Sequence, residues 1–210
     1  MPRVPVRVKI CGITRLEDAL AAAAAGADAV GFNFWPGSKR FIAPQAARAI
    51  AARLPPFVTA VGVFVNQDPA LVRTACLAAG CGAAQLHGDE PPGDAAAVGL
   101  PVLKAFRLAA ADDLRALDGW PGTALLLDAP SEGYGGSGRA SDWALARRAV
   151  EAGRTVILSG GLTPENVASA VRAVRPWAVD VASGVESSPG VKDRERLARF
   201  VRAAKEVPDP

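Results

Sequence analysis

Two side chains in this sequence could move protons on and off a bound molecule: the thiol of Cys11 and the carboxyl group of Asp128. Each follows an apolar run, VRVKI before Cys11 and ALLL before Asp128. A thiolate at the edge of a polar cavity can act as a general base, and a carboxyl group at the rim of an apolar strand can act as a general acid. A structural role stays open for both, because cysteine is often a small buried residue and aspartate often caps a helix or forms a surface ion pair.

Two segments near the C-terminus, SGGL at 159–162 and SGVE at 183–186, are suited to binding a phosphate group. Glycine lets backbone N–H groups approach phosphate oxygens closely, and the N-terminus of a following helix favours negative charge. We therefore expect a phosphate to contact Gly160, Gly161, Ser183 and Gly184. The alternative is that these glycines only form tight turns, which is a common use of glycine.

Arg40 and His87 are further candidates for binding. Arg40, in the segment PGSKRF, could hold a carboxylate through two parallel hydrogen bonds, or it could be a solvated loop charge. His87 is the single histidine of the chain and could contact a ligand or be a hydrogen-bonded residue at the rim of the site. A metal site is not expected, because one histidine and dispersed cysteines do not form a ligand cluster.

Strand-like apolar runs alternate with alanine-rich helical runs along the chain. Strands are expected at 6–10, 29–34, 58–65, 83–86, 101–106, 123–128, 155–159 and 178–182, and helices near 15–25, 44–53, 69–79, 90–98, 111–117, 142–152, 164–174 and 193–206. Eight consecutive βα units predict one α/β domain over residues 1–210, a closed (β/α)8 or TIM barrel. An open doubly wound sheet is the alternative, but its dinucleotide-binding form should carry G-x-G-x-x-G after the first strand, where this chain has CGIT.

In such a barrel the active site lies at the C-terminal ends of the strands, and the last two loops commonly bind phosphate. The reactive and glycine-rich segments all fall at these ends. Lys9 and Asp180 fall within the first and last strands, which are neighbours in a closed barrel. Lys9 also shares its strand face with Cys11, so we expect Lys9 and Asp180 to pair near the cavity floor, since an unpaired charge there would be costly. Asp142 is well placed to cap the helix expected from about residue 142.

The composition argues against several classes of protein. The chain has 210 residues, half of them hydrophobic, which suits one domain with a large core. The net charge of +3 is small and scattered, so nucleic acid is not an expected partner. No run of 18 apolar residues and no signal-peptide pattern is found, so we expect a cytoplasmic protein without a membrane partner. Three cysteines do not make a disulfide framework, and Cys76 and Cys81 are expected to be buried.

The assembled pattern resembles the phosphoribosylanthranilate isomerase family, which acts in tryptophan biosynthesis. The matching segments are KICGIT, GFNFWPGSKRF, VGVFVN, QLHGDE, LLLDA, GGSGR followed by DW, LSGGLTPENV and DVASGVESSPGVKD. Each segment is a weak signal, but they occur in the family's order over nearly the whole chain. One departure is Ser141, which stands where the family usually has an aromatic residue before DW, so the lid over the substrate is expected to be less apolar.

The resemblance implies a ribulose-phosphate-binding (β/α)8 barrel and an Amadori rearrangement that needs no cofactor. The substrate would be N-(5-phosphoribosyl)anthranilate and the product 1-(2-carboxyphenylamino)-1-deoxyribulose 5-phosphate. It also implies that Cys11 is the general base, that Asp128 is the general acid, that Arg40 binds the anthranilate carboxylate and that the loops with Gly160, Gly161, Ser183 and Gly184 bind the phosphate. His87 and Asp180 are expected among the substrate-binding residues. The protein is expected to be a monomer or a homodimer.

Two other functions stay open at this point. The related aminoaldose-phosphate isomerase of histidine biosynthesis would carry an aspartate where this chain has Cys11. Indole-3-glycerol phosphate synthase is disfavoured, because that family has an N-terminal extension and a lysine that acts as the general acid, and neither is evident in this sequence. A sugar-phosphate-binding barrel without catalysis is the alternative from another class, although a binder would not need both Cys11 and Asp128.

Overall fold

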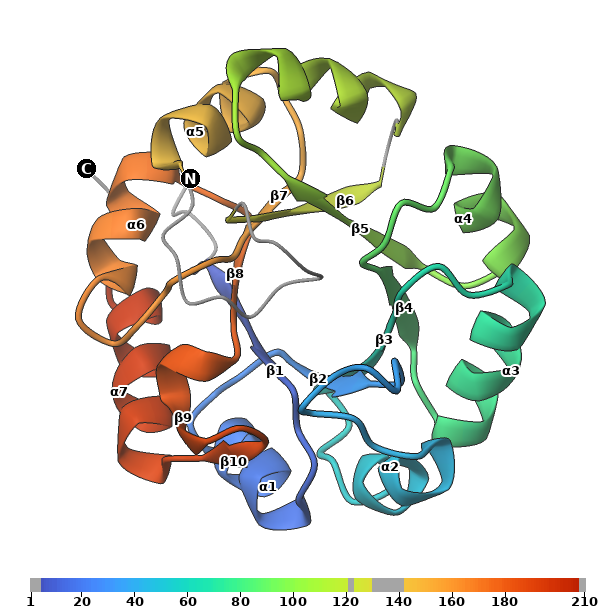
Figure 1. Cartoon of the computed structure of the whole chain (residues 1–210). Helices are drawn as coiled ribbons and strands as arrows, with labels where there is room; N and C mark the ends of the chain where they lie inside the picture. Colours follow the sequence, from blue (N-terminus) through green and yellow to red (C-terminus); the bar gives the residue numbers. More distant parts are fainter. Residues whose placement is uncertain (1–4, 121–122, 130–141, 208–210) are drawn as a thin grey trace.

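The computed structural model describes residues 5–120, 123–129 and 142–207, and their central feature is a closed barrel of eight parallel strands (Figure 1). The strands are β1 Arg7–Cys11, β2 Ala29–Asn33, β3 Thr59–Phe64, β4 Ala83–Leu86, β5 Val102–Arg107, β6 Ala124–Asp128, β7 Val156–Leu158 and β8 Ala178–Val181. Each strand pairs with its neighbours in chain order, and β8 pairs with β1 to close the ring. The predicted (β/α)8 fold is therefore confirmed.

Helices surround this barrel on the outside (Figure 1). They are α1 Leu16–Ala24, α2 Pro44–Ala51, α3 Pro69–Ala79, α4 Pro92–Val98, the 3-10 helix η1 Ala111–Gly119, α5 Trp143–Glu151, α6 Val167–Val174 and α7 Arg194–Lys205. Local chemistry sets several of their ends. Asp142 accepts hydrogen bonds from two backbone N–H groups at the start of α5, as predicted, and Asp193 does the same for α7. Gly80 ends α3 in the left-handed conformation that glycine adopts without strain.

Three segments differ from the sequence-based expectation. The stretch expected as a helix near 111–117 forms a 3-10 helix, in which only Leu117 is buried, so little apolar packing favours a regular α-helix there. The helix expected from 164 starts at Val167, because the Asn166 side chain and the Thr163 backbone form a tight turn before it. A short 3-10 helix η2 Ser183–Val185 and a hairpin of β9 Glu186–Ser188 and β10 Val191–Lys192 follow β8 and were not expected.

The apolar core has two parts. The larger part lies between the strands and the helices and includes the fully buried Phe32, Phe64 and Phe200. The smaller part is a separate layer formed by Ala105, Leu126, Ile157 and Ala178. Three of these residues lie two positions before the cavity-lining Asp128, Ser159 and Asp180, so they share the inward face of their strands and form the layer below the cavity. This layer fills the barrel interior, so the polar groups are concentrated at its carboxyl-terminal end.

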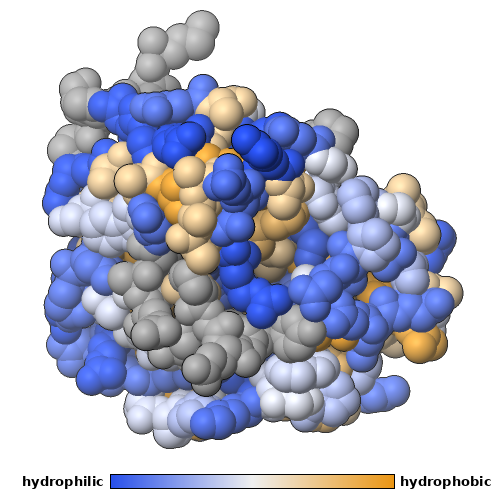
Figure 2. All heavy atoms as spheres, turned by 45° about the horizontal axis from the view of Figure 1, so that its top comes forward, coloured by the Kyte–Doolittle hydropathy of each residue, from blue (hydrophilic) through white to orange (hydrophobic). Residues whose placement is uncertain are grey.

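The surface completes this separation of polar and apolar residues. Hydrophilic side chains cover most of the face drawn in Figure 2, with smaller hydrophobic areas between them. Within the described residues, no helix has the length and apolar character needed to cross a membrane.

Candidate active site

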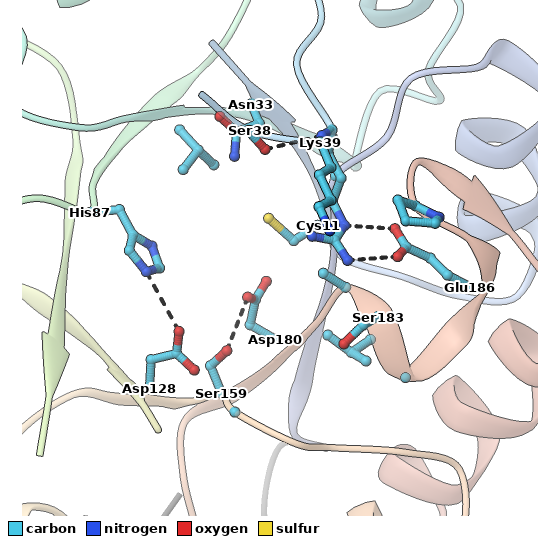
Figure 3. Close-up of a pocket in the computed structure, with 18 of the residues that line it drawn as sticks. Cys11, Asn33, Ser38, Lys39, His87, Asp128, Ser159, Asp180, Ser183 and Glu186 are labelled. Atoms are coloured by element: carbon cyan, nitrogen blue, oxygen red, sulfur yellow. Dashed lines mark hydrogen bonds and ion pairs between the residues drawn. The ribbon is translucent and has the colours of Figure 1, made fainter. Parts of the chain in front are cut away.

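A cavity of about 750 Å³ opens at the carboxyl ends of the strands. Its volume is in the range of about 300–1,000 Å³ that is typical of small-molecule sites. All nine residues proposed for the site from the sequence line it: Cys11, Arg40, His87, Asp128, Gly160, Gly161, Asp180, Ser183 and Gly184. Figure 3 shows that Cys11, His87, Asp128 and Asp180 point from different strands toward one open space. The barrel thus brings together residues that are far apart in the chain, while their individual roles stay predictions.

Cys11 lies beside a buried ion pair on the floor of this cavity. Lys9 Nζ lies 2.7 Å from Asp180 Oδ1, and both side chains are almost fully buried, which confirms the expected Lys9–Asp180 contact. A Cβ atom on Gly31, the neighbour of Cys11 on β2, would lie only 2.9 Å from the Cys11 sulfur and 3.2 Å from Lys9 Cε. Glycine at this position therefore makes room for the thiol and for the lysine stem side by side.

The charges around Cys11 act on its ionisation in opposite directions. Burial raises the pKa of the Cys11 thiol above its ordinary value, and the Asp180 carboxylate adds to this rise, whereas Lys9 and Lys192 oppose it. Burial alone would lower the pKa of Lys9, but its attraction to Asp180 and Cys11 raises that pKa, so Lys9 stays a cation. A thiolate formed at Cys11 would thus have a permanent positive neighbour.

Asp128 and His87 lie side by side on one side of the cavity (Figure 3). Asp128 Oδ2 lies 3.6 Å from His87 Nε2, and Asp128 Oδ1 accepts a hydrogen bond of 2.9 Å from the backbone N–H of Ala129. His87 Nδ1 and Gln85 Nε2 are 2.7 Å apart. Among the described residues, Gln85 Oε1 and His87 Nε2 have no hydrogen-bond partner although both atoms are buried. Sequence reasoning missed Gln85, which shares its strand face with His87 two residues later.

The glycines of the last two loops are required by close backbone packing. Gly160 has φ of 87°, and a Cβ atom there would lie 2.6 Å from the Ala129 backbone nitrogen and 2.9 Å from Asp128 Oδ1. A Cβ atom on Gly184 would collide with the carbonyl oxygen of Leu162. Ser183 and Gly184 begin η2, whose first N–H groups have no acceptor within the helix. Close backbone packing therefore explains these glycines, while phosphate binding by the loops stays a prediction.

Arg40 has a partner that the sequence did not predict. Its Nε and Nη2 atoms donate hydrogen bonds of 2.9 and 2.7 Å to the two carboxylate oxygens of Glu186. Lys192 Nζ donates to the same carboxylate at 2.8 Å and to the Cys11 carbonyl oxygen at 2.6 Å. Arg40 is thus an anchored group at the cavity wall, not a solvated loop charge. Glu186 and Lys192 were missed because no local pattern connects them with Arg40.

Two features of the sequence fall outside the described residues: the matching segment GGSGR at 135–139, and Ser141 with the expected effect on the lid. Within the described part of the chain, no group of three or more histidine, cysteine or acidic side chains is arranged to hold a metal ion.

Comparison with known proteins gives a consistent picture. A family model described as N-(5'phosphoribosyl)anthranilate (PRA) isomerase matches residues 8–203. The N-(5'-phosphoribosyl)anthranilate isomerase of Myxococcus xanthus is 50% identical over 206 residues, covering 96% of this chain and 97% of that protein. The crystal structure of phosphoribosyl anthranilate isomerase from Thermotoga maritima has a TM-score of 0.90 and 48% identity, covering 95% of this chain and 98% of that one.

Two further solved structures bear on ligand and assembly. One is a phosphoribosyl anthranilate isomerase in complex with reduced 1-(o-carboxyphenylamino)-1-deoxyribulose 5-phosphate, with a TM-score of 0.86 and 46% identity, covering 95% of this chain and 98% of that one. The other holds monomers of the dimeric enzyme from Thermotoga maritima, with a TM-score of 0.86, 44% identity and the same coverage. A phosphorylated ligand and a dimeric form are therefore known among similar proteins.

Proposed function

The chain belongs to the N-(5'-phosphoribosyl)anthranilate isomerase family, and on this premise we propose that it carries out the family reaction with Cys11 as general base and Asp128 as general acid. It is an isomerase of tryptophan biosynthesis, and the substrate is N-(5'-phosphoribosyl)anthranilate. The product is 1-(2-carboxyphenylamino)-1-deoxyribulose 5-phosphate. The observation that supports this assignment of roles is that the Cys11 thiol, on β1, and the Asp128 carboxyl group, on β6, line the same cavity.

Ring opening is the first step of the proposed mechanism. Protonated Asp128 donates its proton to the furanose ring oxygen, and the bond between that oxygen and C1′ breaks. The nitrogen lone pair forms a C=N bond to C1′, giving a protonated Schiff base and an Asp128 carboxylate. His87 Nε2, 3.6 Å from Asp128, is close enough to interact with the carboxylate or with the newly formed hydroxyl.

Proton removal by Cys11 is the second step. The thiolate takes the proton from C2′, and the C–H electron pair forms the C1′=C2′ bond of an enolamine while the nitrogen becomes neutral. The enolamine then tautomerises to the ketone, with a proton added to C1′ and the C2′ hydroxyl proton lost. Substrate and product have the same atoms and the same number of electrons, so the reaction needs no external oxidant or reductant. Each positioned proton transfer contributes about 10²–10⁴-fold to such a rate.

The rest of the cavity binds the two ends of the substrate. Arg40 holds the anthranilate carboxylate, and the loops that contain Gly161, Ser183 and Gly184 hold the phosphate. Asp180 and His87 contact the ribose portion between these ends. Because the carboxylate and the phosphate are held at separate points, the sugar between them is oriented. This orientation lowers the activation free energy of the proton transfers.

The test is turnover of freshly prepared phosphoribosylanthranilate, followed by the loss of anthranilate fluorescence. Wild type should turn over, and Cys11→Ser and Asp128→Asn should each lose at least about 10²-fold in kcat. Cys81→Ala is the matched control, because it removes a buried thiol that does not line the cavity. Full activity in Cys11→Ser would refute the role of the thiol as base.

The alternatives give distinct results in the same assay. A binding protein would show affinity for the substrate without turnover, and both variants would bind it as wild type does. An aminoaldose-phosphate isomerase of histidine biosynthesis would prefer that pathway's substrate when both are offered. Sedimentation of the same preparation distinguishes a monomer from the homodimer known among similar structures.

A further inference from the structure

The guanidinium group of Arg40 has two edges, and the structure fills one of them. Nε and Nη2 form the edge that grips both oxygens of Glu186. No described residue accepts a hydrogen bond from Nη1, and Arg40 lines the cavity. Because the guanidinium group is a rigid plane, fixing one edge also fixes the direction of the edge formed by Nη1 and Nη2.

The stem of Arg40 is held as firmly as its head. Gly12 has φ of 74°, and a Cβ atom at this glycine would collide with Arg40 Cδ. The arginine stem therefore lies directly over the backbone that follows Cys11. The side chain is only 15% exposed, so few rotamers are open to it.

Glu186 and Lys192 set the charge of this group. The Lys192 side chain is completely buried, and its Nζ donates to Glu186 Oε1 as well as to the carbonyl oxygens of Cys11 and Ala182. Burial raises the pKa of Glu186, but its hydrogen bonds and charge interactions with Arg40 and Lys192 outweigh burial and lower that pKa, so Glu186 stays ionised. Burial lowers the pKa of Lys192, and its charge interaction and hydrogen bond with Glu186 oppose that fall. With Lys192 protonated, two cations and one anion leave one net positive charge, which suits one incoming carboxylate.

We propose that Glu186 is a positioning residue for substrate specificity: it aims the free edge of Arg40 at the substrate's carboxylate, and Lys192 preserves the positive charge that Glu186 would otherwise cancel. This inference rests on the proposed function, in which Arg40 binds that carboxylate. Glu186 acts through Arg40, so its removal should impair recognition of the carboxylate and leave the proton transfers largely intact.

The decisive experiment measures binding of two ligands by calorimetry. One is the reduced product 1-(o-carboxyphenylamino)-1-deoxyribulose 5-phosphate, and the other is the same compound without the carboxylate. Glu186→Gln should weaken binding of the first about 10-fold and of the second less than about 2-fold, in line with the loss of a charge-assisted contact. Equal weakening of both ligands would overturn the proposal.

A double-variant cycle tests whether Glu186 acts through Arg40. Glu186→Gln should raise KM about 10-fold with a smaller change in kcat, and it should add less than about 2-fold in an Arg40→Gln background. Independent, multiplying effects would contradict the proposal. The matched control is Glu165→Gln, which breaks an exposed pair with Arg199 and should change neither constant.

A second variant keeps the test meaningful if Glu186→Gln does not fold. Arg40→Lys retains the positive charge and can still pair with Glu186, but it has no second edge. It should lose nearly as much affinity for the carboxylated ligand as Arg40→Gln does. Retention of wild-type affinity in Arg40→Lys would overturn the proposal. If wild type turns over the substrate but the Arg40 variants bind the ligand with and without the carboxylate as wild type does, this inference is refuted. The isomerase assignment would still hold.

Discussion

Two buried glutamate–lysine pairs hold loops at the mouth of the barrel, and they differ in what they face. Glu90 accepts from Lys104 at 3.0 Å and from the backbone N–H groups of Asn66 and Gly88, which fixes the loop that carries His87. Glu186 accepts from Lys192 in a similar way but also from Arg40. Glu186 lines the cavity, whereas Glu90 and Lys104 do not.

The comparison shows that a buried ion pair is not by itself a functional signal. The Glu90 carboxylate and its lysine satisfy each other and the backbone around them, so the group is closed. The Glu186 group is open, because it holds a second cation with one edge still available. What distinguishes the Glu186 group is the edge of Arg40 that remains available at the cavity, and not the burial of the charges.

The largest expected effect is on stability in the closed group. Lys104→Met leaves Glu90 buried without a cation, and we expect a loss of about 3–5 kcal/mol in the free energy of unfolding. KM should stay within about 3-fold of wild type, because Glu90 and Lys104 do not line the cavity. Urea denaturation and steady-state kinetics at a temperature where the variant is folded check both statements. A large rise in KM with wild-type stability would contradict the comparison.

Lys192→Met should show the opposite balance. Glu186 keeps Arg40 as a partner, so we expect a smaller stability loss of about 1–3 kcal/mol from the hydrogen bonds of Lys192. Glu186 would then neutralise Arg40, and KM should rise about 10-fold. The same denaturation and kinetic measurements apply. If Lys104→Met and Lys192→Met raised KM equally, the distinction between closed and open groups would fail.

A third buried pair, Lys9–Asp180, should act on the pH dependence. Burial raises the pKa of Cys11 above its ordinary value of 9.0, and a base works when deprotonated, so kcat/KM should rise with pH through the alkaline range. Lys9→Met removes a cation that lowers this pKa, so the rise should move to higher pH. Lys9→Arg, which keeps the charge, should not shift it upward. A shift to lower pH in Lys9→Met would refute the role of Lys9.

The smallest expected effect is at the surface. Glu165 pairs with Arg199, and their side chains are 63% and 45% exposed. Glu165→Gln should leave the urea midpoint close to that of wild type, because solvent screens exposed pairs. Urea denaturation in low and high salt checks this, and a loss comparable with that of Lys104→Met would mean that burial does not set the scale.

The sequence alone determined the order of elements and which end of the strands lines the cavity. Alternating apolar and alanine-rich runs define eight βα units, and period-two alternation places Lys9 with Cys11 and Asp180 within a neighbouring strand. The runs and the alternation are local patterns. That the first and last strands are neighbours follows because eight βα units close into a barrel. One local prediction was still wrong in type: the stretch from Ala111 forms a 3-10 helix. Whether such a stretch forms an α-helix or a 3-10 helix depends on its packing against the barrel, which the sequence pattern does not contain.

Only the tertiary structure decided which charged groups meet. Arg40 and Glu186 are 146 residues apart, and Lys192 reaches the Cys11 carbonyl oxygen across 181 residues. No periodicity encodes these contacts, because they depend on the hairpin after β8 folding back over the end of β1. Which charged side chains form an ion pair depends on their distance and burial in the folded chain. The sequence therefore identified Arg40 as a candidate, while the fold supplied Glu186 and Lys192, which give Arg40 its direction and the group its net charge.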